Sequence, residues 1–171
     1  MLSGSPYVLD EEGLAMWSER YADAWIGLLE THKRLTRHLD AELETAYGIT
    51  LSALEVLGRL AVSAGRSLRL SALANSCGLS LSRISRIVDS LEARGLVERR
   101  AVEGDARAVD AHLTEGGLEL ARRAMRGHCE SVRQRFFDQL SGEEIASLAA
   151  IFARFTPRAR KARTRPTNRR C

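Results

Sequence analysis

The feature that most constrains the fold is a change in the spacing of apolar residues at Gly95. Before this glycine, apolar residues recur every three to four positions, which indicates amphipathic helices. After it, in the stretch LVERRAVEGDARAVDAHL, they alternate, which indicates two strands around a turn at Gly104 and Asp105. A short helix, a glycine, a second helix and a β-hairpin therefore follow one another. This order predicts a winged helix-turn-helix over residues 50–114.

Residues that begin or end helices divide the part of this segment that precedes the hairpin. We expect a helix over about residues 50–63 and a short strand near residues 68–70. Ser71 is expected to cap the next helix, SALANSC, because a serine hydroxyl accepts a hydrogen bond from a free N–H of the first turn. Gly78 is expected to end that helix, and Ser80 to cap the one that follows.

Long helical patterns lie on both sides of this segment. The first predicts a helix over residues 12–46, preceded by a flexible N-terminus of residues 1–11. The second predicts two helices within residues 115–156, and Ser141 with Glu144 forms a capping box that opens the later one. These helices carry more apolar surface than one small core can cover, so we expect a homodimer. The fold class is mainly α with a small β-wing.

The net charge of +4 comes from the C-terminal end of the chain. Residues 157–171 contain seven basic residues and no acidic one, so removing them from +4 leaves −3 for the remainder. We expect this tail to be disordered, and it either adds phosphate contacts to DNA or merely keeps the protein soluble. The high isoelectric point therefore does not by itself argue that the folded part binds nucleic acid.

The three cysteines, Cys77, Cys129 and Cys171, are odd in number and lack the spacing of a metal site. No secretion signal or run of apolar residues long enough to cross a bilayer is present. We therefore expect a cytoplasmic protein that has no membrane partner, no structural disulfide, no metal and no cofactor.

The second helix of the helix-turn-helix has one apolar and one polar face. The apolar residues lie within a narrow arc: Ile84, Ile87, Val88 and Leu91. Ser82 and Arg86 lie opposite this arc, and Arg83 and Ser85 lie at its sides. An arginine fork can pair with guanine in the major groove, and the N–H groups near Ser80 favour a phosphate. The alternative is an ordinary solvated helix face.

The β-hairpin adds a second basic feature. Arg107 lies just past its tip, two residues after Asp105. A guanidinium on a narrow hairpin can enter the minor groove, where the potential of DNA is most negative, and Asp105 can orient it through an ion pair. The alternative is a surface hairpin without function.

On these residues the chain resembles the MarR family of bacterial transcription regulators. Two stretches carry the resemblance, LSALANSCGLSLSRISRIVDSLEARGLVERR and DARAVDAHLTEGG. The second is close to the family's wing pattern, an Asp-x-Arg followed by a strand and Leu-Thr-x-x-Gly. The resemblance covers residues 12–156 as one domain, in which residues 12–46 and 115–156 form the dimerisation helices.

The resemblance implies a homodimer that binds a palindromic operator in double-stranded DNA and usually represses transcription. It implies a small aromatic or other anionic effector that weakens DNA binding. It places Ser82, Arg83, Ser85 and Arg86 on the recognition helix, and Arg107 with its partner Asp105 on the wing. The basic tail is not part of the family's pattern.

Trp25 and His32, on the apolar face of the first long helix, are candidate effector contacts, because the family's effector cleft lies between the dimerisation helices and the DNA-binding lobe. The alternative for His32 is a histidine of the core. Other readings are a thiol- or metal-responsive regulator of the same fold, and a protein-interaction module that does not read DNA. An enzyme is not expected, since the sequence has no glycine-rich phosphate loop and no nucleophile elbow.

Overall fold

A computed structural model describes residues 5–102 and 105–155, although the side chains of residues 102–108 are not described. The chain divides into two units, residues 1–131 and 132–171. The first unit contains β1 (Tyr7–Leu9), β2 (Ala15–Trp17), α1 (Glu19–Tyr47), α2 (Leu51–Val62), β3 (Ser67–Arg69), α3 (Leu70–Cys77), α4 (Leu81–Glu92), β4 (Val97–Val102) and β5 (Asp105–Leu113). Helix α5 (Glu115–Arg135) begins in the first unit and ends in the second, which also contains α6 (Gly142–Phe152).

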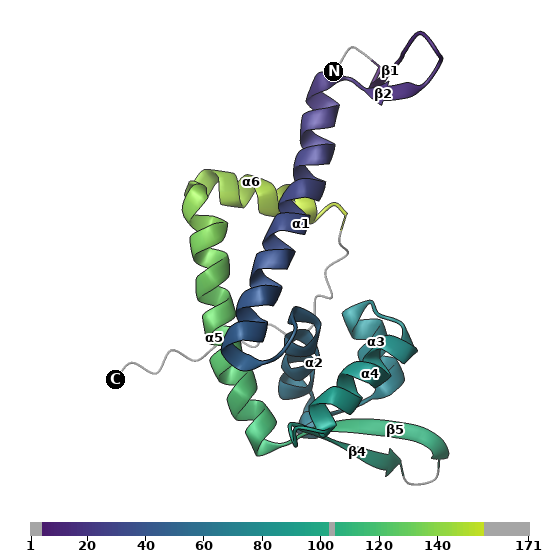
Figure 1. Ribbon diagram of the computed structural model, residues 1–171, viewed down its shortest axis with the longest axis vertical. Coiled ribbons are helices and arrows are strands. Elements are labelled where there is room, and N and C mark those ends of the chain that lie inside the picture. Colours follow the sequence, from purple (N-terminus) through teal and green to yellow (C-terminus); the bar gives the residue numbers. More distant parts are fainter. Residues whose placement is uncertain (1–4, 103–104, 156–171) are drawn as a thin grey trace. The chain divides into compact units, whose positions relative to one another are not determined.

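The apolar faces of α2, α3 and α4, together with residues of α1, β4, β5 and α5, form the core of the first unit. Figure 1 shows α2, α3 and α4 side by side. Leucines spaced three residues apart place Leu54, Leu57 and Leu60 on one side of α2, where each is almost completely buried. Leu73 of α3 and Ile84 of α4 are fully buried in the same cluster. Helices α3 and α4, with the turn at Gly78 between them, thus form the helix-turn-helix that the sequence predicts, and α2 packs against both.

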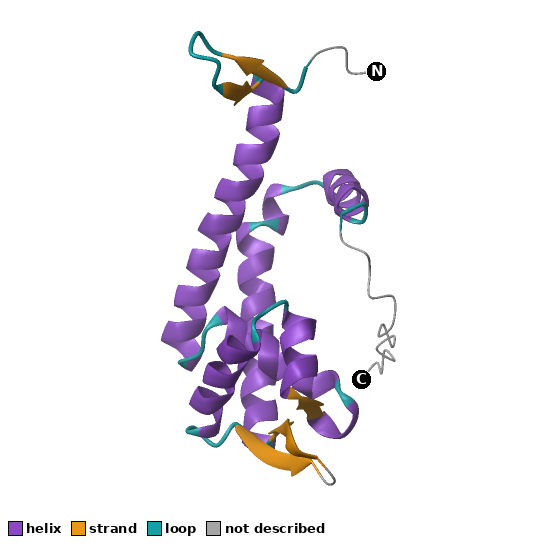
Figure 2. Ribbon diagram, turned by 90° about the vertical axis from the view of Figure 1, so that its right-hand side faces the viewer, coloured by secondary structure: helices purple, strands orange, loops and turns teal. Residues whose placement is uncertain are grey.

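A three-stranded antiparallel sheet with the order β3-β5-β4 completes the winged helix. In β5, Ala111 and Leu113 are buried. Asp110 and His112, which alternate with them along the strand, are only partly buried. This alternation matches the two-residue period of a half-buried strand. Figures 1 and 2 show β4 and β5 as a hairpin that projects from the helices.

Most of the predicted helix boundaries are confirmed. Gly78 follows α3 with φ of +64°, a left-handed conformation that glycine adopts without strain. The Ser80 hydroxyl accepts a hydrogen bond from the Arg83 N–H at 3.3 Å and so caps α4. The capping box of Ser141 and Glu144 is present at the start of α6.

The prediction that Ser71 caps α3 is wrong. The helix begins one residue earlier, at Leu70, and Arg69 occupies the capping position without a side-chain hydrogen bond. The physical reason is the pairing of β3 with β5, which holds the chain extended up to Arg69 and leads directly into the helix.

The N-terminal prediction also differs from the structure. Helix α1 begins at Glu19, and residues 7–17 form a two-stranded hairpin instead of a flexible end and the first turns of a helix. The Asp10 carboxylate accepts hydrogen bonds from the Glu12 N–H at 3.0 Å and from the Leu14 N–H at 2.8 Å. These side-chain hydrogen bonds favour a turn at residues 10–14 over the first turns of the predicted helix.

No helix within residues 5–102 and 105–155 has both the length and the apolar character that crossing a bilayer requires. The predicted tail of residues 157–171 lies outside the described residues.

The junction between the wing and α5 explains the Leu-Thr-x-x-Gly pattern. The Thr114 hydroxyl lies 2.8 Å from the Gly95 carbonyl oxygen, to which it donates, and accepts a hydrogen bond from the Gly117 N–H at 3.0 Å. A Cβ atom on Gly117 would lie 2.0 Å from the Leu96 carbonyl oxygen. The first turn of α5 therefore packs directly against the backbone that follows α4, and only glycine fits there.

Gly117→Ala is expected to lower the free energy of unfolding by about 2–3 kcal/mol, because the added methyl group forces the helix away from Leu96. Gly116→Ala is the matched control, since a Cβ there would meet only the Thr114 hydroxyl oxygen at 3.8 Å. We expect this control to stabilise the protein by up to about 1 kcal/mol. Urea unfolding of both variants measures the difference, and equal stabilities would contradict the close approach.

Candidate nucleic-acid interface

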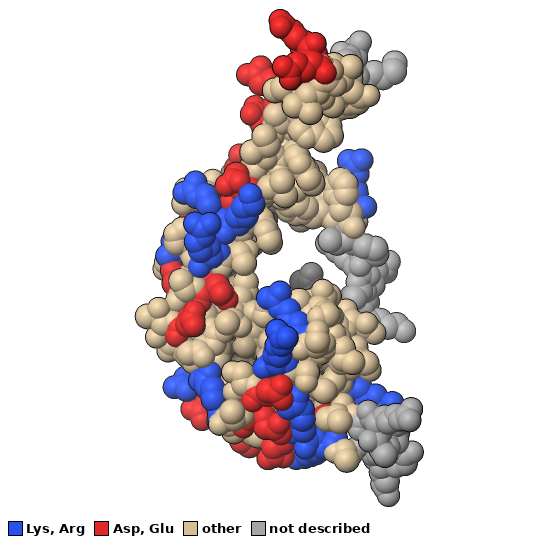
Figure 3. All heavy atoms as spheres, turned by 45° about the vertical axis from the view of Figure 1, so that its right-hand side comes forward, with Lys and Arg blue, Asp and Glu red and all other residues tan. Residues whose placement is uncertain are grey.

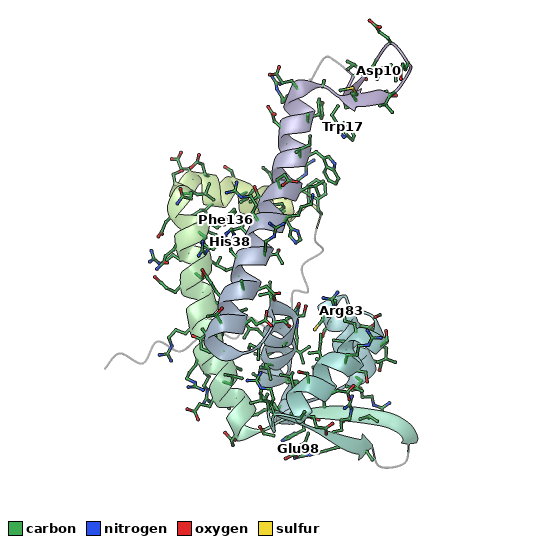
Figure 4. All side chains as sticks on the ribbon, in the orientation of Figure 1. Asp10, Trp17, His38, Arg83, Glu98 and Phe136 are labelled. Carbon is green, nitrogen blue, oxygen red and sulfur yellow. The ribbon has the colours of Figure 1, made fainter. Side chains whose placement is uncertain are left out.

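The polar side chains of helix α4 are exposed because its apolar face packs in the core. Ile84, Val88 and Leu91 are at most 1% exposed. Ser82, Arg83 and Arg86 are exposed on the remaining surface of the helix. Figure 4 labels Arg83 on this helix.

Four of the seven residues predicted to bind DNA border one groove, which has a volume of about 650 Å³. They are Ser80, Ser82, Arg83 and Arg86. The opposite wall is formed by Glu44 and Gly48 at the end of α1 and by Thr50 at the start of α2. The groove therefore presents hydroxyl and guanidinium donors to a hydrogen-bond-accepting ligand, together with the carboxylate of Glu44.

Arg94 is a groove residue that sequence reasoning missed. Its guanidinium donates to the Gly48 carbonyl oxygen at 2.6 Å and to the Tyr47 carbonyl oxygen at 3.1 Å. These carbonyls belong to the C-terminal end of α1, where the last carbonyl groups of a helix lack helical partners and carry partial negative charge. Arg94 thereby ties the segment after α4 to the end of α1.

Arg99, in β4, ties α4 to the wing. Its backbone N–H donates to a Glu92 carboxylate oxygen at 2.8 Å, and Nη1 donates to the other oxygen at 2.9 Å and also to Asp89. Nη2 donates to the Ser85 carbonyl at 3.2 Å and to its hydroxyl at 3.1 Å. One guanidinium therefore satisfies acceptors along two turns of α4.

These hydrogen bonds determine the protonation of the cluster. Hydrogen bonds from the Arg99 backbone and side chain hold the pKa of Glu92 below its ordinary value, because they favour the ionised carboxylate. Burial alone would lower the pKa of Arg99, but hydrogen bonds to Glu92 and Asp89 outweigh it and raise that pKa. Both shifts favour the charged forms of Glu92 and Arg99.

Comparison with known proteins places this geometry in a family. The family model described as MarR family matches residues 47–108, from the end of α1 into the wing. AbsC from Streptomyces coelicolor, described as a MarR family transcriptional regulator, is 34% identical, and the match covers 82% of this chain and 94% of AbsC with a TM-score of 0.76. The chain belongs to the MarR family.

Two further relatives inform the function of this MarR family member. Sco3205 from Streptomyces coelicolor, solved in complex with DNA, is 34% identical, and the match covers 82% of this chain and 91% of Sco3205 with a TM-score of 0.77. The transcriptional repressor MprA from Escherichia coli (strain K12) is 32% identical over 99 residues, which are 54% of this chain and 56% of MprA. The chain spans about half the length of the curated relatives that it matches.

Among the other predicted site residues, Ser85, Trp25 and His32 do not border the groove. Ser85 is half-buried, and its hydroxyl accepts a hydrogen bond from Arg99, so the structure assigns it a partner in the wing of this MarR fold. The side chains of Asp105 and Arg107 lie outside the described residues, although the backbone of both belongs to β5. Trp25 and His32 are exposed on α1 and do not border the groove.

Arg99→Ala is expected to lower the free energy of unfolding by about 1–2 kcal/mol, because it removes the guanidinium hydrogen bonds to Asp89, Glu92 and Ser85, while the backbone N–H at position 99 still donates to Glu92. Arg100→Ala is the matched control, since Arg100 is exposed and pairs with exposed Glu98. That control is expected to change stability by less than about 0.5 kcal/mol. Chemical unfolding measures both, and an equally small effect of Arg99→Ala would show that the cluster does not stabilise the wing.

The stability contributed by Glu92 is expected to depend on pH. Its pKa is lowered in the folded state from an ordinary value of 4.5, so the unfolded state takes up the proton first as the pH falls. The contribution is therefore fully present above about pH 5 and is lost as the pH falls through the folded-state pKa. Unfolding of the wild type and of Glu92→Gln between about pH 7 and pH 3 should give stabilities that converge in acid. A constant difference would contradict the assignment.

Proposed function

We propose that this protein is a sequence-specific DNA-binding transcriptional regulator, and that it represses transcription as a homodimer on a palindromic operator. The observation that carries the proposal is the groove in which Ser80, Ser82, Arg83 and Arg86 lie together on the uncommitted face of α4. A relative of the same family solved with DNA, and another described as a repressor, support it.

The groove residues have the chemistry that reading a duplex requires. Arginine at position 86 can donate two parallel hydrogen bonds to O6 and N7 of a guanine in the major groove, and Ser82 can donate to or accept from several base edges. The N-terminus of α4, near Ser80, favours a phosphate oxygen. Arg107 on the wing is proposed to enter the adjacent minor groove, with Asp105 orienting it.

The homodimer is supported by the uncovered surface of α1. Trp25 and Leu28 are each more than two-fifths exposed on this helix. Two-fold pairing buries such a surface on both protomers at once. It also sets two recognition helices about 34 Å apart, the spacing of successive major grooves.

The proposed effector is a small aromatic or anionic compound that weakens DNA binding, with Trp25 and His32 as candidate contacts. A thiol-responsive alternative would use Cys77, which is half-buried. Burial raises the pKa of the Cys77 thiol, and this disfavours the reactive thiolate. No catalytic activity is proposed.

Arg86→Ala is expected to weaken binding to the operator by about 1–3 kcal/mol and to relax sequence preference, because it removes a contact to a base edge. Arg107→Ala is expected to lower affinity for many sequences alike. Fluorescence anisotropy with duplexes from the upstream region of the gene itself, read against scrambled duplexes, measures both effects at a fixed salt concentration.

Arg122→Ala is the matched control, since Arg122 is an exposed arginine of α5 that does not border the groove. It removes the same charge and should change operator affinity by less than about 0.5 kcal/mol. Wild-type affinity in the Arg86→Ala variant would reject the groove as the reading surface.

A further inference from the structure

Leu81, the first residue of α4, is an exposed apolar residue on the helix that is proposed to read DNA. Its exposed fraction is 54%, whereas Leu79, two residues earlier, packs against the core. Among the described side chains from α2 to β5, the only other large apolar one that is exposed is Val62, at the end of α2. Packing within the winged helix therefore does not account for a leucine at position 81.

The position of Leu81 in the helix explains its exposure. Side chains of an α-helix tilt towards the N-terminus, so that each covers the turn before its own. Leu81 opens α4, and no earlier turn of this helix lies beneath its side chain. The side chain therefore projects beyond the N-terminal end of the helix. This is the end whose residues contact base edges when a recognition helix lies in the major groove.

Leu81 extends the exposed face of α4 on the side of the wing. At about 100° per residue, it lies within about 40° of Ser85, whose hydroxyl is bonded to β4 of the wing. Arg83 and Arg86 lie on the other side of Ser82 and border the groove, which Leu81 does not. Figure 3 shows basic and uncharged side chains next to one another over the winged helix. The exposed face thus has guanidinium donors towards the groove and an apolar side chain towards the wing.

The neighbours of Leu81 in the first turn have part of their hydrogen bonds satisfied within the protein. The Ser80 hydroxyl accepts from the Arg83 N–H at 3.3 Å, and the hydroxyls of Ser80 and Ser82 lie 3.1 Å apart, within hydrogen-bond distance of each other. Both hydroxyls therefore have fewer hydrogen bonds left to make with a base. The apolar side chain between them is the largest contact that this turn offers to a ligand.

An apolar side chain in the major groove has one specific partner among the bases. The four base pairs differ there in their hydrogen-bond donors and acceptors, which hydroxyl and guanidinium groups can recognise. Thymine also carries a methyl group at C5, which an apolar side chain recognises by contact. The groove residues supply the hydrogen-bonding groups, and Leu81 supplies the apolar one.

We propose that Leu81 recognises a thymine by packing against its C5 methyl group in the major groove. The proposal rests on the proposed function and adds a base preference to it. Each half-site of the operator then contains a thymine beside the bases that the groove residues contact. Burial of one methyl group against the leucine favours thymine over a base without this group by about three- to fivefold in affinity.

Replacement of single thymines by deoxyuridine tests this contact, because it removes the methyl group and keeps every hydrogen-bonding group. The operator is first located by footprinting on the upstream region of the gene itself. Fluorescence anisotropy with the full-length protein then measures the Kd for each substituted duplex. For the wild type, we expect the Kd to rise about three- to fivefold at one thymine in each half-site. In Leu81→Ala, the same replacement should change the Kd by less than about 1.5-fold.

Two further variants separate recognition of the methyl group from a structural effect. Leu81→Met keeps an apolar side chain of similar size and should keep the sensitivity to deoxyuridine. Val62→Ala is the matched control, because it shortens an apolar side chain that is 80% exposed on another helix, and it should behave as the wild type. If Leu81→Ala binds more weakly but remains as sensitive to deoxyuridine as the wild type, Leu81 acts only through the structure and the proposal is overturned.

The same measurements distinguish this proposal from the proposed function. If the wild type binds its operator and no replacement of thymine weakens binding, the assignment of Leu81 fails and the proposed function stands. If the wild type binds the upstream region no better than scrambled duplexes, the proposed function fails and the assignment of Leu81 with it.

Discussion

The structure depends on the burial of one face of α4. Ile84, Val88 and Leu91 are drawn into the core formed with α2 and α3, and full burial of such side chains stabilises the fold by about 1.5–3 kcal/mol each. Since side chains leave a helix at fixed angular intervals, the choice of the buried face also selects the exposed one. Ser82, Arg83 and Arg86 are exposed because the apolar residues of α4 occupy the face that packs in the core.

Hydrogen bonds from two arginines fix the position of α4 relative to its neighbouring elements. Arg94 joins the segment after α4 to the last carbonyls of α1, and Arg99 joins the outer side of α4 to the wing. Arginine suits both positions because its planar guanidinium offers several donors in a rigid arrangement. A helix held on two sides has less conformational freedom to lose when it binds a ligand, and this favours affinity.

The two β-hairpins of the chain contrast in how they are supported. The wing is backed by β3 on one edge and by α4 through Arg99, so its strands share in the core. The N-terminal hairpin of residues 7–17 has a well-formed turn, but its side chains stay exposed on both faces. Local chemistry is sufficient to shape a hairpin, whereas burial is needed to hold it.

The sequence by itself determined the elements whose cause is local. Helical spacing, the serine cap at Ser80 and the alternation in β5 predicted the winged helix, and the helical wheel of α4 predicted that Ile84, Val88 and Leu91 are buried and that Ser82, Arg83 and Arg86 are exposed. One of the two errors has a local cause and the other a non-local one. The Asp10 turn displaced the start of α1, and pairing of β3 with β5 displaced the start of α3.

Only the tertiary structure decided the partners of Arg94, Arg99 and Ser85. The carbonyls that Arg94 binds lie 46 and 47 residues earlier in the chain, and the Ser85 hydroxyl lies 14 residues before Arg99 on another element. Periodicity depends on neighbours a few residues away, so it can be read from the chain. A hydrogen bond between separate elements depends on how their buried faces pack, and that is settled only when the whole core has formed.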